Sequence, residues 1–402
     1  MFDLLTGIRV VELAQWVMVP SAGALLADFG ADVIKIEHPD GGDPYRGLTT
    51  FALRDSGTGE SPSVAHTNRG KRSIGLDVKT EDGRQLLLDL IASADVLLTS
   101  FRAPALARLG LDVESARALN PRLVYARGNA FGTEGTDRDA PGYDATAFWS
   151  RGGFAYSLTA DGAEYPAQMR PALGDRATSM ALALGVCAAL TKRERTGSAP
   201  LIDVSLMGTA GWMLAGDLLG ALHGIDPKQE PHRSRNPNPL TNVYRTFDGR
   251  WITLNGLQPD RYWDELCCVI DRVDLIVDPR FVDGTARAAN ADACLAELDA
   301  TFASAPYDEW VKRFADFTGP WAPVQGAKDY IHDPQVRDNG WIVQLDGEDR
   351  PVYAIAGPVS TDAGDRRLQR SPRIGEHTAE IVAELRRSPA EIADLENRDV
   401  IS

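Results

Sequence analysis

Asp175 is the carboxylate with the clearest potential for chemistry in this chain. It follows Gly174 and opens a segment rich in Ala and Leu, Asp175–Arg195, that predicts a long helix. One interpretation is an N-cap, because Asp at a helix start accepts hydrogen bonds from free backbone N–H groups. The other is a nucleophile. The helix start would keep the carboxylate ionised, Gly174 would let a substrate approach the backbone, and an ionised carboxylate can attack an activated acyl group. The residues alone leave both open.

Basic residues gather at Asn68-Arg69-Gly70-Lys71-Arg72, in a chain whose 42 Lys and Arg face 57 Asp and Glu, a net charge of −15. The segment is either a solvated loop or one wall of a phosphate pocket, which would also take Lys35, His38, Arg102 and Arg108. Pro141-Gly142-Tyr143-Asp144 is explained by a turn.

Composition excludes several classes of protein. The negative charge argues against non-specific nucleic-acid binding, which depends on Lys and Arg. The apolar runs are shorter than the roughly 20 residues that span a bilayer, and the N-terminus lacks the layout of a signal peptide. The four cysteines form no CxxC pattern, so we expect neither a disulfide framework nor a zinc site, and a cytoplasmic location. GxGxxG, Walker A, G-x-S-x-G and HExxH motifs are absent.

Alternating strand and helix patterns fill the first half of the chain and predict an α/β fold with a parallel sheet. The predicted strands are Ile8–Leu13, Asp32–Glu37, Ser73–Val78, Asp95–Thr99, Leu123–Ala126 and Leu201–Val204. The predicted helices are Pro20–Phe29, Thr80–Ala92, Asp175–Arg195 and Leu206–His223.

A smaller unit follows a Pro- and Asn-rich boundary at Gly224–Pro239. Its patterns predict a hairpin (Asn242–Phe247 and Trp251–Asn255), helices near Pro259–Cys268, Ala288–Ala303 and Pro306–Phe317, and a strand at Ala322–Val324. Two further strands, Trp341–Leu345 and Pro351–Ile355, and a helix near Glu376–Leu385 close the chain.

In its order of short motifs the sequence resembles the class III CoA-transferase family, which includes formyl-CoA transferases, carnitine CoA-transferases and 2-methylacyl-CoA racemases. The motifs are LTGIRVVEL (5–13), LLADFGA (25–31), DVIKIE (32–37), NRGKRSIGLD (68–77), PGYD (141–144), Gly174-Asp175, IDVS (202–205), GPWAPV (319–324), DPQV (333–336) and GEHT (375–378).

The resemblance implies that Asp175 is the nucleophile of an acyl-CoA:carboxylate CoA-transferase, working through aspartyl anhydride and aspartyl-CoA thioester intermediates. It implies acyl-CoA as cosubstrate, and neither a metal nor a redox cofactor. By position, the CoA contacts would be Val17, Met18, His38, Lys71, Arg72, Leu76, Ser100, Phe101 and Arg108. His38 and Ser100 replace the Arg and Asn that are common there, which puts those two contacts in doubt.

The acyl pocket would take Gln15, Trp16, Phe131, Tyr143 and Gly174. Its aromatic residues either accept a bulky acyl group or belong to the core. The racemase branch uses a His where Tyr143 stands, and Tyr is a poor proton exchanger near neutrality, so transferase is favoured over racemase or epimerase. A silent CoA-binding paralogue is the third alternative. The short Ser234–Thr241 stretch leaves oxalate or formate activity in doubt.

The resemblance also implies a large Rossmann-like domain and a small α+β domain in a ring-shaped chain that forms an interlocked homodimer. The expected boundaries are 1–200 for the first part of the large domain, 201–224 for a linker helix, 225–325 for the small domain, and 326–402 for a return segment completing the large one. The expected partners are an acyl-CoA, a carboxylic acid and a second copy of the chain, with no nucleic acid or membrane.

Overall fold

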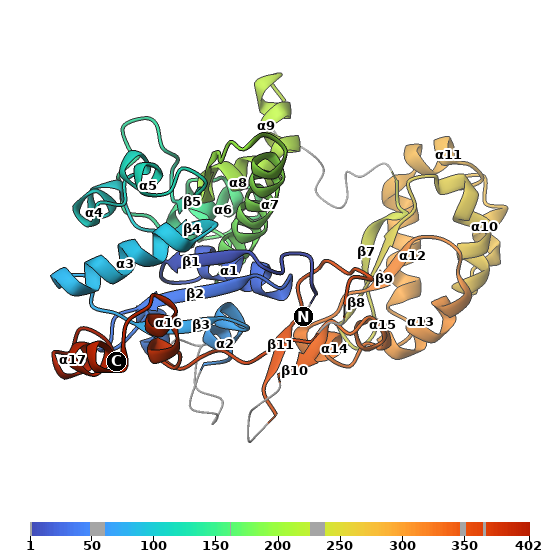
Figure 1. Ribbon diagram of the computed structural model, residues 1–402. Coiled ribbons are helices and arrows are strands. Elements are labelled where there is room, and N and C mark those ends of the chain that lie inside the picture. The colour runs from blue at the N-terminus through green and yellow to red at the C-terminus, as the bar shows by residue number, and fades with distance from the viewer. Residues whose placement is uncertain (1, 49–60, 161, 226–237, 346–350, 365–366) are drawn as a thin grey trace. The chain divides into compact units, whose positions relative to one another are not determined.

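The computed structural model describes residues 2–48, 61–160, 162–225, 238–345, 351–364 and 367–402 (Figure 1). The chain divides into two compact units. One comprises Met1–Leu218 together with Arg337–Ser402, and the other comprises Leu219–Val336. The C-terminal segment therefore packs with the N-terminal part of the chain.

A six-stranded sheet forms the centre of the first unit. Its strands are β1 (Arg9–Leu13), β2 (Asp32–Glu37), β3 (Arg72–Gly75), β4 (Val96–Thr99), β5 (Val124–Asn129) and β6 (Leu201–Ser205). The order is β3-β2-β1-β4-β5-β6, and every neighbouring pair is parallel. This is the order of a Rossmann sheet. The prediction of an α/β fold with a parallel sheet is confirmed.

Helices cover both faces of this sheet, because alternate strand residues point to opposite sides. Val10, Val33 and Val96 share one core with α1 (Met18–Asp28), α7 (Leu173–Thr196) and α8 (Leu206–Met213). Val11 and Leu97 share the other core with the helices of the opposite layer. That layer contains α3 (Glu81–Ser93), α4 (Ala103–Leu109), α5 (Val113–Leu119), α16 (Thr378–Glu384) and α17 (Pro389–Asn397). The unit thus has three layers.

Helix α7 is long and apolar enough to cross a membrane by length and composition, the one such helix among the described residues. Its Leu182, Val186 and Leu190 are buried in the core that α7 shares with α1. The helix therefore belongs to the interior of the unit.

The segment 201–224 differs from the expected linker helix. Its first residues form β6, and two helices follow, α8 and α9 (Ala215–Leu222), with a break at Leu214. The glycines at 208, 211, 216 and 220 explain the break, since Gly weakens a helix interior. Most of the predicted boundary Gly224–Pro239 lies outside the described residues.

The second unit is an antiparallel sheet packed against helices. The strands β7 (Thr241–Arg245), β8 (Trp251–Asn255) and β9 (Trp321–Pro323) pair in that order, which confirms the predicted hairpin. Trp263, Phe302 and Trp310 lie at the centre of its core. The helices are α10 (Pro259–Val269), α11 (Gly284–Ala289), α12 (Ala291–Phe302), α13 (Tyr307–Arg313) and α14 (Ala327–Tyr330), with 3-10 turns η5 (Val273–Ile276) and η6 (Phe314–Asp316).

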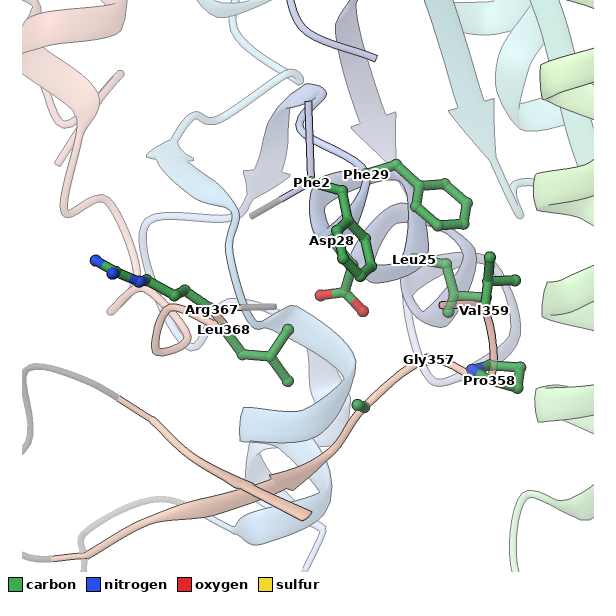
Figure 2. A pocket seen from close by; sticks show the side chains of 10 residues that line it. Phe2, Leu25, Asp28, Phe29, Gly357, Pro358, Val359, Arg367 and Leu368 are labelled. Carbon is green, nitrogen blue, oxygen red and sulfur yellow. The ribbon is translucent and has the colours of Figure 1, made fainter. Parts of the chain in front are cut away.

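After α15 (Pro334–Asp338), the chain forms the hairpin β10 (Ile342–Gln344) and β11 (Tyr353–Ile355) and then returns to α1. Gly357 and Pro358 lie beside Leu25 and Phe29, around a cavity of about 20 Å³ (Figure 2). This volume holds one water molecule, so the cavity is a packing gap. The remaining elements are η1 (Pro44–Gly47), α2 (Pro62–Asn68), η2 (Asp144–Ser150, a π-helix) and α6 (Phe154–Ser157).

A cluster of buried charges lies between the sheet and α1. Glu12 and Lys35 are opposite one another on β1 and β2, and the Lys35 ammonium donates to Glu12 (3.1 Å) and Asp43 (2.9 Å). The Lys71 ammonium donates to the same Glu12 oxygen at 2.9 Å. Burial alone would favour a neutral Lys35 amine, but the carboxylates of Glu12 and Asp43 raise its pKa. Two cations and two carboxylates thus balance one another in the interior.

Replacing Glu12 by Ala should lower the free energy of unfolding by about 3–5 kcal/mol, because it leaves the Lys71 charge buried without its carboxylate. Urea denaturation at pH 7 measures this. Replacing the exposed Glu164 by Ala is the control, with an expected change within about 0.5 kcal/mol. Equal changes in the two variants would show that the cluster does not support the fold.

Candidate active site

A cavity of about 730 Å³ opens at the carboxyl edge of the sheet. Its wall follows the ends of four strands: Gln15 and Trp16 after β1, Ser100 and Phe101 after β4, Asn129 and Ala130 at the end of β5, and Leu206 after β6. The strand order reverses between β1 and β4, and ligands of doubly wound folds bind in the crevice at that switch point. The cavity is therefore where this topology places a ligand.

Asp175 reaches this cavity from the first turn of α7. The helix begins after Ala172, whose backbone is left-handed (φ 61°), and no side chain caps it from that position. Burial, and then the charge of Asp144, raise the pKa of Asp175 to about 7, against the opposing effect of Arg176. A substantial share of the carboxyl is therefore ionised at neutral pH.

Asp144 supplies the missing cap from a distant part of the chain. It is buried at the start of η2, and its Oδ2 accepts the backbone N–H of Gly174 at 3.2 Å. Burial raises the pKa of Asp144, against the backbone N–H groups of Asp175 and Gly174. Within the described chain its Oδ1 is buried and has no hydrogen-bond partner. The N-cap interpretation of Asp175 is therefore wrong, since Asp144 takes that role.

Gly174 is required by packing. A Cβ at this position would lie 2.1 Å from Cγ of Phe148 and 2.4 Å from Oδ1 of Asp144. The residue is buried and lies outside the cavity lining, so the expectation that its backbone receives the substrate is not met. Gly174 instead lets η2 approach the first turn of α7.

Trp16 and Tyr143 form an aromatic wall of the cavity. Their rings meet edge to face, with centroids 5.5 Å apart. Tyr143 is 59% exposed. Trp16 has a left-handed backbone (φ 70°), which is rare for a residue other than Gly and typical of strained positions at functional sites.

The structure brings seven of the fifteen predicted site residues together and leaves the other eight outside the cavity lining. The lining includes Gln15, Trp16, Met18, Ser100, Phe101, Tyr143 and Asp175. Val17 and Leu76 are buried by packing, and the Lys71 ammonium is fully buried in the ion cluster. Arg72 pairs with Asp32, Glu380 and Glu384.

Four more predicted residues also lie outside the cavity lining. His38 lies 3.8 Å from the Asp77 carboxylate, Arg108 is in the last turn of α4, and Gly174 packs against Phe148. Phe131 lies under the Arg151 guanidinium.

Several residues of the cavity were not singled out from the sequence. They include Arg127, Asn129, Arg138 and Asp139. Arg127 and Asn129 lie at the end of β5, one and three residues beyond the predicted end of that strand, and Arg127 pairs with Asp203 of β6. Their position directly after a predicted buried strand is the sequence signal that could have identified Arg127 and Asn129. Among the described residues no group of three His, Cys, Asp or Glu side chains could hold a metal ion.

Comparison with known proteins places the whole chain in one family. The family model described as CoA-transferase family III matches residues 5–378. Cinnamoyl-CoA:phenyllactate CoA-transferase of Clostridium sporogenes is 32% identical over 406 residues, covering 99% of this chain and 98% of that protein. Succinate–glutarate CoA-transferase of Agrobacterium fabrum is 35% identical over 394 residues, covering 95% of each.

A solved structure shares the fold over nearly the full length. The crystal structure of a CAIB/BAIF family protein from Brucella suis is 31% identical, with a TM-score of 0.83, and the match covers 96% of this chain and 100% of that one. Sequence and structure agree, and the chain therefore belongs to CoA-transferase family III and is a transferase enzyme.

Proposed function

We propose that the chain transfers CoA from an acyl-CoA to a carboxylic acid with Asp175 as the nucleophile. The observation that carries this proposal is the position of Asp175 in the switch-point cavity, with its helix capped by another residue. A carboxylate that does not cap its own helix is available to react. Its pKa near 7 also makes it more basic than an ordinary Asp, and basicity favours attack on a thioester.

Each half of the reaction passes through Asp175. Its carboxylate attacks the thioester carbonyl of the donor and gives an acyl-aspartyl anhydride and CoA thiolate. The thiolate attacks the aspartyl carbonyl, which gives an aspartyl-CoA thioester and releases the donor acid. The acceptor carboxylate attacks this thioester, and the released thiolate takes the new acyl group from the second anhydride. Asp175 is regenerated and the energy of the thioester is conserved.

The cavity suits an anionic cosubstrate with an apolar end. Arg102 and Arg138 line it, and a guanidinium group can bind the phosphate oxygens of CoA. We propose that Met18, Ser100 and Phe101 contact the CoA arm and that Trp16 and Tyr143 face the acyl group. The cinnamoyl and phenyllactate substrates named for the Clostridium relative are aromatic acids, and an aromatic wall is compatible with an acyl group of that kind.

We also propose an interlocked homodimer in the cytoplasm. In the first unit, the neighbouring helices α7 and α8 expose large apolar side chains. An exposed apolar surface of this kind is suited to burial by a second copy of the chain. These side chains are Met180, Leu184, Trp212 and Met213. All four cysteines are free thiols, which fits a reducing compartment.

Asp175→Asn should abolish transfer, since the amide cannot form the anhydride. Formation of the acceptor's CoA thioester would be measured with wild-type enzyme, Asp175→Asn and a control, Asp292→Asn, which alters an exposed Asp in the first turn of α12. Borohydride added during turnover should modify Asp175 of the wild type alone, as seen by peptide mass. Full turnover by Asp175→Asn would exclude the proposed nucleophile.

The value of kcat/KM should rise with pH through an apparent pKa near 7, because only ionised Asp175 attacks. Asp144→Asn keeps an oxygen for the Gly174 N–H but removes a negative charge beside Asp175, so the pKa of Asp175 should fall. The rising limb should therefore move to lower pH, and activity at pH 6 should increase relative to pH 8. A limb that stays in place would show that Asp144 does not set this pKa.

Analytical ultracentrifugation should find twice the 43.6 kDa mass of the chain. Interlocked subunits separate only by unfolding, so dilution of the native protein should give no folded monomer. Leu184 of α7 is 72% exposed, and Leu184→Glu should prevent assembly. The control Leu119→Glu, on α5, should leave assembly unchanged. A folded, stable monomer of the wild type would rule out interlocking.

A further inference from the structure

The three residues Ala14, Gln15 and Trp16, called the cavity loop below, are held by three side chains, of which Lys35 and Asp43 lie outside the cavity lining and Ser100 belongs to it. The Lys35 ammonium donates to the carbonyl oxygen of Ala14 at 3.1 Å. Oδ1 of Asp43 accepts the backbone N–H of Trp16 at 3.1 Å, and Oγ of Ser100 accepts that of Gln15 at 3.2 Å. Every residue of the cavity loop therefore has one backbone group bound by a side chain.

The cavity loop needs such support because its conformation is strained. Trp16 is left-handed at φ 70° and carries its indole to the edge-to-face contact with Tyr143. Strained backbone persists only where its surroundings over-determine it. Trp16 and Tyr143 line the same cavity as Asp175, so the strain is located where substrate would bind.

Lys35 and Asp43 are suited to rigid support. Their side chains are 0% and 1% exposed, and the three donors of the Lys35 ammonium go to Glu12, Ala14 and Asp43. Asp43 divides its oxygens, with Oδ2 toward Lys35 and Oδ1 toward the N–H groups of Trp16 and Tyr45. Neither side chain lines the cavity, and their hydrogen bonds to Ala14 and Trp16 connect them to the cavity loop.

We propose that Asp43 and Lys35 are positioning residues for CoA transfer, which keep Trp16 against Tyr143 as a fixed wall beside Asp175. The inference rests on the proposed function of Asp175. It assigns a role in catalysis to part of the ion cluster that also stabilises the fold. Reactions that depend on close alignment lose rate when a wall of the site moves by about 1 Å.

Two substitutions at one site separate alignment from stability. Asp43→Asn removes the negative charge opposite the Lys35 ammonium and replaces one of the two acceptor oxygens by an amide nitrogen. The ion pair is therefore lost. Asp43→Glu keeps the charge but displaces the acceptor of the Trp16 N–H by one methylene, and it serves if Asp43→Asn fails to fold. Asp28→Asn is the matched control, because Asp28 is also buried and pairs with a cation, Arg69, at 2.6 Å, away from the cavity loop.

The first measurement does not depend on activity. In protein labelled with 5-fluorotryptophan, the fluorine resonance of Trp16 is identified among the eight Trp by its loss in Trp16→Phe. It should shift or broaden in both Asp43 variants and stay unchanged in Asp28→Asn. The second measurement is kcat per folded molecule, which should fall about 10- to 100-fold in the Asp43 variants and stay at the wild-type value in Asp28→Asn.

Two results would overturn the inference: an unmoved Trp16 resonance in both Asp43 variants, or a moved resonance with wild-type kcat. Loss of kcat in Asp28→Asn equal to that in Asp43→Asn would also overturn it, since any buried carboxylate would then have the same effect. A wild-type chain without transfer activity would contradict the proposed function instead, and the resonance alone would then decide whether Asp43 holds the loop.

Discussion

The site depends on one constraint of the sheet, the reversal of strand order between β1 and β4. After β1 the chain enters α1 on one face, and after β4 it enters α4 and α5 on the opposite face. Parallel strands end at a common edge, so the two departing segments separate there and leave a crevice. The cavity is lined by the loops that diverge at this point. The position of the cavity therefore follows from the strand order of the sheet and not from any particular residue.

Asp144 accepts the backbone N–H at the start of α7, which an Asp within the first turn of a helix normally does itself. An Asp at a helix start normally accepts backbone N–H groups, and these hydrogen bonds keep its pKa low. Here Asp144 accepts the N–H of Gly174 from η2, and Asp175 is left with burial and a like charge. Both of these favour the protonated form and outweigh the opposing charge of Arg176. The fold thereby produces a basic carboxyl from an ordinary residue, and the absence of a side chain at Gly174 makes the close approach of Asp144 possible.

The sequence predicts the parallel sheet and the long helix at Asp175 well, and the buried charges poorly. Strands such as β4 (VLLT) are short apolar runs, and a single strand carries that signal by itself. The partners of Lys71 and Arg72 are Glu12 and Glu384, which are far away in the chain. Nothing local distinguishes such internal ion pairs from a phosphate site. The hydrogen bond from the Gly174 N–H to Asp144 also joins distant residues. The interpretation of Pro141-Gly142-Tyr143-Asp144 as a turn therefore could not include it.

Strained backbone occurs directly before two helices that reach the cavity. Of the five non-Gly residues with positive φ in the described chain, Trp16 precedes α1 and Ala172 precedes α7. The first turns of both helices reach the cavity, at Met18 and Asp175. A left-handed residue turns the chain sharply, so that each helix begins at the site instead of one turn away from it. Such backbone costs about 1–3 kcal/mol per residue, and contacts like those of Asp43 to the Trp16 N–H must offset it. A substitution that removes the left-handed conformation at Trp16 or Ala172 would therefore stabilise the fold only by displacing residues that line the cavity.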